Sequence, residues 1–233
     1  MNIHELPIIS EVYGEGGAGK NSFCFYVSRN ITSLWIEAYP RLSTKRADSL
    51  RLDLESIYVC GVKNIHVLIC MLKAGEIQSF IKDHGVELVV VNRIEDLEEP
   101  CAKGTKNYEE VAKCLKRLYH THKVKTIIVS ETPSLDSVAT RGRMCTEGGQ
   151  EVHRMLDQKL CSYLVLQKYL KKAIPVSSIQ SVSWEYCMPT KICIQRTPEA
   201  GVRSVKIVKP DIPGMPEYVM RIRDGSIDLE KIN

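Results

Sequence analysis

The chain has 233 residues, of which 44% are hydrophobic and 26% charged, as in an ordinary globular protein. Its net charge of +4 permits an anionic partner without requiring one, and its longest apolar run, near residues 66–72, is far too short to cross a bilayer. We therefore expect an intracellular protein without a membrane segment, built from one large domain or two small ones. Nine cysteines without a C-x-x-C pair favour a reducing compartment and no zinc site.

Short β-branched runs alternate with helical patterns along most of the chain. Strands are predicted at Ile8–Tyr13, Ser33–Glu37, Asn64–Cys70, Glu87–Val91 and Lys125–Ser130. Helices are predicted at residues 20–30, 46–59, 72–84, 107–122 and 150–159. This alternation is typical of βαβ units and a mostly parallel sheet. Later strands, which predict antiparallel additions at one edge, are expected at Cys161–Gln167, Lys191–Gln195, Ser204–Val208 and Tyr218–Ile222.

A glycine-rich segment, EVYGEGGAGKNS, joins the first predicted strand to the first predicted helix. Gly14, Gly19 and Lys20 have the spacing of the phosphate-binding loop G-x-x-x-x-G-K-[ST]. Asn21 stands where the hydroxyl residue that holds Mg²⁺ belongs. Backbone amides of such a loop face a phosphate, and the following helix adds its positive end.

This segment predicts a site for ATP, with or without Mg²⁺. Its residues are Gly14, Glu15, Gly16, Gly17, Ala18, Gly19, Lys20, Asn21 and Ser22. A glycine-rich turn that holds no ligand is the alternative. Two further loops, Glu95–Lys106 and Pro133–Gly149, follow predicted strands, at the carboxyl ends where an open α/β sheet places its ligands. A polar surface loop is the alternative for each.

The order of these segments resembles the RecA-type recombinases of the RadA branch, particularly the RadB-like paralogues. The segments that carry the resemblance are EVYGEGGAGK, SLWIEAYP, VELVVVNRIEDL, KTIIVSETP, GGQEVHRMLDQKL and the C-terminal stretch from residue 196. The resemblance implies an α/β fold with a RecA-like P-loop core, a mostly parallel twisted sheet flanked by helices, and antiparallel C-terminal strands. It also implies one ATPase core domain over residues 1–233, without the N-terminal helical DNA-binding domain.

The departures from the family pattern fall where its chemistry occurs. Asn21 and Asn92 stand at the two positions that hold magnesium, and their neutral amides bring no charge to a divalent cation. Ser22 does not replace Asn21 simply, because one residue along a helix rotates the side chain by about 100°. Tyr39 stands where the family has the glutamate that orients the attacking water.

Glu131 replaces the family's polar switch residue and puts a negative charge where a third phosphate would be sensed. Together these changes predict nucleotide binding with weak or absent hydrolysis. The alternative is that another carboxylate takes over the catalytic role. Glu37 and Glu131 are the catalytic candidates, with Glu95 and Asp96 as further replacements. A magnesium site near Asn21 and Asn92 is kept as an alternative.

Two loops hold single-stranded DNA in the family, and their counterparts here are the two loops described above. Arg141 and Arg143 in the second loop, and Lys103 and Lys106 in the first, are the predicted DNA-binding residues. Neither loop contains an aromatic residue for base stacking, which weakens single-strand binding.

The resemblance implies a recombinase paralogue in homologous-recombination DNA repair. Such a protein binds ATP, hydrolyses it weakly or not at all, and assists a recombinase filament or a complex of paralogues on DNA. Two alternatives stay open: an active DNA-dependent ATPase that promotes strand pairing, and a nucleotide-free scaffold subunit. A nuclear location is expected, or a cytoplasmic one in an organism without a nucleus.

Overall fold

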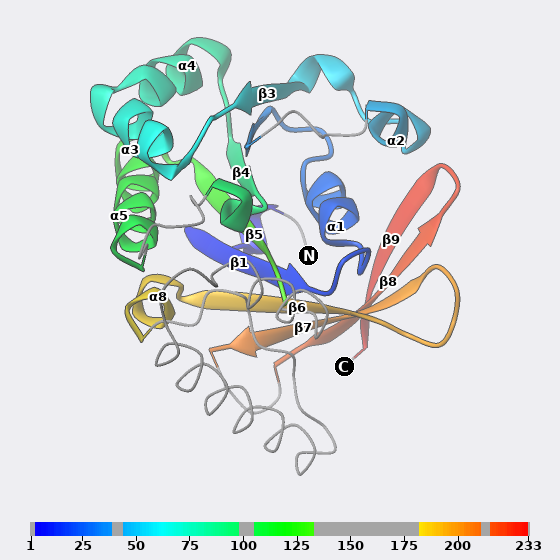
Figure 1. Ribbon diagram of the computed structural model, residues 1–233. Helices are drawn as coiled ribbons and strands as arrows, with labels where there is room; N and C mark the ends of the chain where they lie inside the picture. The colour runs from blue at the N-terminus through cyan, green and yellow to red at the C-terminus, as the bar shows by residue number, and fades with distance from the viewer. Residues whose placement is uncertain (1–2, 39–43, 98–104, 133–181, 211–214, 233) are drawn as a thin grey trace, which may run out of the picture.

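The computed structural model describes residues 3–38, 44–97, 105–132, 182–210 and 215–232. Their strands form one nine-stranded sheet in the order β3-β2-β4-β5-β1-β6-β7-β8-β9 (Figure 1). The parallel part consists of β1 (Ile9–Gly14), β2 (Ser33–Glu37), β3 (Ile57–Gly61), β4 (Leu88–Asn92), β5 (Lys125–Glu131) and β6 (Thr190–Arg196). The antiparallel additions are β7 (Val202–Lys209), β8 (Glu217–Arg223) and β9 (Ser226–Ile232). The predicted mixed α/β fold with antiparallel C-terminal strands is confirmed.

Helices flank both faces of the sheet (Figure 1). One face carries α3 (Ile65–Ala74), α4 (Glu76–His84), α5 (Thr105–His122) and α8 (Val182–Cys187), and the other carries α1 (Lys20–Val27) and α2 (Thr44–Ser49). Short 3₁₀ turns are η1 (Ile3–Glu5), η2 (Leu54–Ser56) and η3 (Ile94–Leu97). Val89 and Val91 of β4 join one apolar cluster, whereas Leu88 and Val90 join the other. Successive strand residues point to opposite faces, so both faces of β4 are buried.

The predicted strand at Asn64–Cys70 is wrong, because these residues begin helix α3. The Asn64 side chain accepts a hydrogen bond from the backbone N–H of Val67 at 3.0 Å and so caps the helix. The buried residues Ile65, Leu68 and Leu72 then recur at helical spacing. Gly75, with φ of +88°, separates α3 from α4, so the predicted helix at residues 72–84 is two helices.

The predicted helix at residues 46–59 is also wrong over most of its length. Helix α2 ends at Ser49, and Asp53 accepts a hydrogen bond from the backbone N–H of Glu55 at 3.1 Å, which caps η2. The β-prone run Ile57–Gly61 then pairs with β2 as strand β3. Strand β9 and helix α8 were not predicted. The predicted helix at residues 150–159 and the predicted strand at Cys161–Gln167 lie outside the described residues.

In the part of the chain that the structure describes, no helix is both long enough and apolar enough to span a membrane.

Candidate functional site

The glycine-rich loop connects the end of β1 to the start of α1, at the carboxyl ends of the parallel strands. A Cβ atom on Gly14 would lie 2.2 Å from the backbone oxygen of Ile194 on β6, so this position requires glycine. Gly17 and Gly19 have φ of +72° and +100°, which a residue with a side chain rarely adopts. The order strand, glycine loop, helix is the context that a phosphate-binding loop requires.

Lys20 is held inside this loop. Its Nζ donates hydrogen bonds to the backbone oxygens of Gly14 at 2.7 Å and Glu15 at 2.8 Å, and the residue is 6% exposed. Burial lowers the pKa of Lys20, while the charges of Glu131 and Glu95 oppose this effect. An ammonium group has three donors, so one remains for a ligand in the cavity beside it.

The cavity beside Lys20 has a volume of about 520 Å³. Ligand sites commonly measure roughly 300–1,000 Å³. One wall is the loop and the first turn of α1, with Gly17, Gly19, Lys20, Asn21 and Ser22. A second wall contains Arg93 and Glu131 at the strand ends. A third contains Gly201 of the β6–β7 turn, Arg203 of β7 and Ile222 of β8. Gly19 at the start of α1 has no side-chain cap, so the first helical amides face this cavity without a competing side-chain acceptor.

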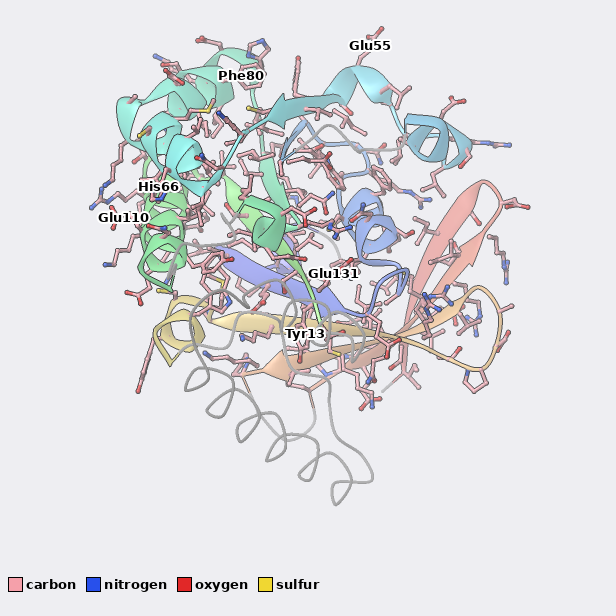
Figure 2. All side chains as sticks on the ribbon, viewed as in Figure 1. Tyr13, Glu55, His66, Phe80, Glu110 and Glu131 are labelled. Carbon is pink, nitrogen blue, oxygen red and sulfur yellow. The ribbon has the colours of Figure 1, made fainter. Side chains whose placement is uncertain are left out.

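Glu131 lies at the end of β5 (Figure 2), and two cations flank it. Its carboxylate is 3.8 Å from Lys20 Nζ and 3.7 Å from Arg93 Nη2. Arg93 follows the last residue of β4, and its Nε also lies 3.0 Å from a carboxylate oxygen of Asp96. The predicted catalytic candidate Glu131 therefore faces the cavity as part of an ion-pair network.

Glu95 lies behind this network, on η3. Its Oε1 accepts a hydrogen bond from the backbone N–H of Glu131 at 3.1 Å, whereas its Oε2 is buried without a hydrogen-bond partner among the described residues. Burial raises the pKa of Glu95 to about 7; the charges of Glu131 and Asp96 add to the rise, and Arg93 opposes it. Glu95 therefore titrates near neutral pH.

Glu37 and Asn92 pair with each other at the ends of β2 and β4. Asn92 Nδ2 donates to Glu37 Oε1 at 2.7 Å, and the two residues are 5% and 2% exposed, respectively. Neither residue lines the cavity. Asn92 Oδ1 is buried with no hydrogen-bond partner in the described chain, so it can accept from a bound water.

The two positions predicted to hold magnesium, Asn21 and Asn92, bring no carboxylate to the cavity. Asn21 offers only a neutral amide to the cavity, and Asn92 lies outside the lining. Within the described ranges, no group of three or more histidine, cysteine, aspartate or glutamate side chains is arranged to hold a metal. Mg²⁺ in proteins is usually held by carboxylates together with phosphate oxygens.

Two arginines at the loop were not predicted from the sequence. Arg196, at the end of β6, donates through Nη2 to the backbone oxygen of Gly16. Arg203, on β7, lines the cavity, and its Nε is buried without a hydrogen-bond partner in the described residues. Each lies one residue outside a predicted C-terminal strand: Arg196 follows Lys191–Gln195, and Arg203 precedes Ser204–Val208.

The predicted DNA-binding residues Arg141, Arg143 and Lys103 lie outside the described residues, as does Tyr39. Lys106 belongs to the first turn of α5. The cavity wall therefore brings Glu131 together with five of the predicted loop residues, whereas Glu37 and Asn92 are not part of the wall; the five are Gly17, Gly19, Lys20, Asn21 and Ser22.

No protein-family model matches this chain, and a comparison with curated proteins finds no match either.

Proposed function

We propose that this chain binds a nucleotide by its phosphates in the cavity beside α1. The observation that carries the proposal is the loop between β1 and α1, in which Lys20 is anchored by two backbone oxygens and keeps a donor for a ligand. The cavity also receives Arg93 and Arg203, which suit an anionic ligand. Its volume of about 520 Å³ is that of a small-molecule site.

We further propose a RecA-like P-loop core that hydrolyses ATP weakly or not at all. Glu37 is hydrogen-bonded to Asn92, outside the cavity lining, and Glu131 is engaged by Lys20 and Arg93. Because both carboxylates already interact with other side chains, neither is positioned to act as the general base that activates a water molecule. The neutral side chains of Asn21 and Asn92 support the same proposal.

The biological role that we propose is supported by the sequence segments that resemble RadB-like recombinase paralogues and follow one another in the same order. We propose a recombinase paralogue that serves homologous-recombination repair in the nucleus, with a recombinase or further paralogues as its protein partners and single-stranded DNA as its nucleic-acid partner. Nucleotide in such a subunit stabilises the folded chain by mass action, even without turnover.

Lys20→Ala is expected to weaken ADP and ATP binding by at least about tenfold, because it removes a charge-assisted hydrogen bond to the phosphates. Isothermal titration of the purified chain measures this change. Lys63→Ala, which removes an exposed lysine before α3, is the matched control and should bind as the wild type does. Lys20→Gln, which keeps hydrogen-bond donors for the loop oxygens, separates the loss of charge from any loosening of the loop.

Two results would contradict the proposal. Absence of binding at millimolar nucleotide would leave the nucleotide-free scaffold as the better account. Unchanged binding in Lys20→Ala and Lys20→Gln would show that any nucleotide binds elsewhere on the chain.

A further inference from the structure

The Glu131 carboxylate lies in the wall of the cavity, beside Lys20 of the glycine loop. It lies 3.8 Å from Lys20 Nζ and 3.7 Å from Arg93 Nη2, and the side chain is 32% exposed. Neither distance is short enough for a direct hydrogen bond, so the carboxylate is an anion resident between two cations rather than a member of a tight pair. A phosphate that approaches these cations must share them with Glu131.

Backbone hydrogen bonds fix the position of Glu131 beside the loop. Strand β5 lies beside β1, and Glu131 is paired in register with Gly14, the first glycine of the loop. The next residue, Thr132, donates its backbone N–H to the backbone oxygen of Gly14 at 3.1 Å. The Glu131 N–H is bonded in turn to the Glu95 carboxylate at 3.1 Å. Glu131 is therefore held next to the loop by neighbours on two sides.

A third phosphate would extend toward this carboxylate. In a loop of this kind the backbone amides hold the first two phosphates, and the lysine reaches from the second to the third. Here Lys20 Nζ lies 3.8 Å from Glu131 at the end of β5, where Glu131 and Asp96 pair with Arg93 and Glu95 accepts from the Glu131 N–H. Arg93 is already engaged by Glu131 and Asp96. A divalent cation would shield a third phosphate from such carboxylates, but Asn21 offers it only a neutral amide.

We propose that the cavity selects a nucleoside diphosphate over a nucleoside triphosphate, and that the Glu131 carboxylate determines this specificity by repelling the third phosphate. This inference rests on the proposed function, since it concerns the same loop and cavity. Two phosphates can accept hydrogen bonds from the loop amides and from the remaining Nζ donor of Lys20, and this requires no divalent cation. The third phosphate gains no further free cation on the Glu131 side and meets a negative charge instead.

The test is a titration of ADP and of β,γ-methylene ATP, which is not hydrolysed, into the wild-type chain and Glu131→Gln. Each titration is run with EDTA and again with Mg²⁺. The wild type should bind ADP at least about tenfold more tightly than the triphosphate. Glu131→Gln should abolish or reverse this ratio, chiefly by tightening triphosphate binding, because it removes the negative charge beside Lys20 and Arg93. Glu55→Gln, an equal change of charge on the exposed turn η2 before the edge strand β3, should keep the wild-type ratio (Figure 2).

The outcomes separate the inference from the proposed function. Equal affinity of the wild type for both nucleotides, or a Glu131→Gln effect of the same factor on both, would overturn the inference while nucleotide binding stands. Failure of both nucleotides to bind would remove the proposed function and the inference together. If Glu131→Gln does not fold, as judged by circular dichroism, the wild-type ratio and Glu131→Asp decide. Glu131→Asp keeps the charge and should keep a preference for ADP, and its loss would contradict the inference.

Discussion

Replacing Glu11 by alanine is expected to lower the free energy of unfolding by about 3–5 kcal/mol. Glu11 lies in β1 with 0% exposure, and its Oε2 is 3.0 Å from the Nζ of Lys191 on β6. The same carboxylate accepts hydrogen bonds from Trp184 Nε1 at 3.0 Å and from the Ser130 hydroxyl at 2.7 Å. Truncation leaves the buried Lys191 ammonium without this partner, and a buried charge is costly in that state.

A double-mutant cycle separates the pair from the packing around it. Lys191→Met alone should also be strongly destabilising, because the Glu11 carboxylate then stays buried without its cation. Combining Lys191→Met with Glu11→Ala removes both charges, so the double variant should be less destabilised than the sum of the two single variants. Urea denaturation followed by circular dichroism measures all three variants. Strict additivity would show that the Glu11–Lys191 contact contributes nothing of its own.

Glu95→Gln is expected to stabilise the chain at alkaline pH and to have little effect near pH 5. Burial raises the pKa of Glu95 from its ordinary value of 4.5 to about 7, with Glu131 and Asp96 adding to the rise and Arg93 opposing it. The folded state therefore holds the proton more tightly than the unfolded state does. The resulting stability is fully present below about pH 4.5 and is lost as the pH rises through about 7.

The magnitude follows from the pKa change. One pKa unit corresponds to about 1.4 kcal/mol, so a rise from 4.5 to about 7 corresponds to at most about 3–4 kcal/mol, less where solvent screens the carboxylate. Glutamine cannot ionise, and its amide oxygen still accepts the hydrogen bond from the Glu131 N–H. Urea denaturation of the wild type, Glu95→Gln and the exposed control Glu55→Gln at pH 5 to 9 measures the difference. A Glu95→Gln difference that stays constant across this range would contradict the assignment of the titration to Glu95.

The sequence predicts those strands whose side chains are apolar on both faces. The run Leu88–Val91 is apolar throughout, so the strand predicted at Glu87–Val91 matches β4 to within one residue at each end, and β4 is buried along its whole length. The run at Asn64–Cys70 is equally apolar but forms a helix, because the Asn64 cap and the spacing of Ile65, Leu68 and Leu72 outweigh its β-branched residues. Short apolar runs do not distinguish the two structures unless the capping residue is also considered.

The glycine loop and Lys20 are also predictable, because their spacing is local. Arg196 and Arg203 are not, since they reach the loop only through the strand order, which places β6 next to β1 and β7 next to β6. Arg196 bonds to a residue 180 positions earlier in the chain. The pairing of Glu37 with Asn92 likewise depends on the register of β2 with β4, which no local pattern specifies.

The central claim is that the loop between β1 and α1 holds nucleotide phosphates, and a crystal structure of the chain with ADP tests it most directly. We predict that the terminal phosphate accepts hydrogen bonds from the loop amides at residues 16–20 and from Lys20 Nζ, while this nitrogen keeps its bonds to the backbone oxygens of Gly14 and Glu15. ADP bound at another position, with the cavity beside Lys20 unchanged, would contradict the account.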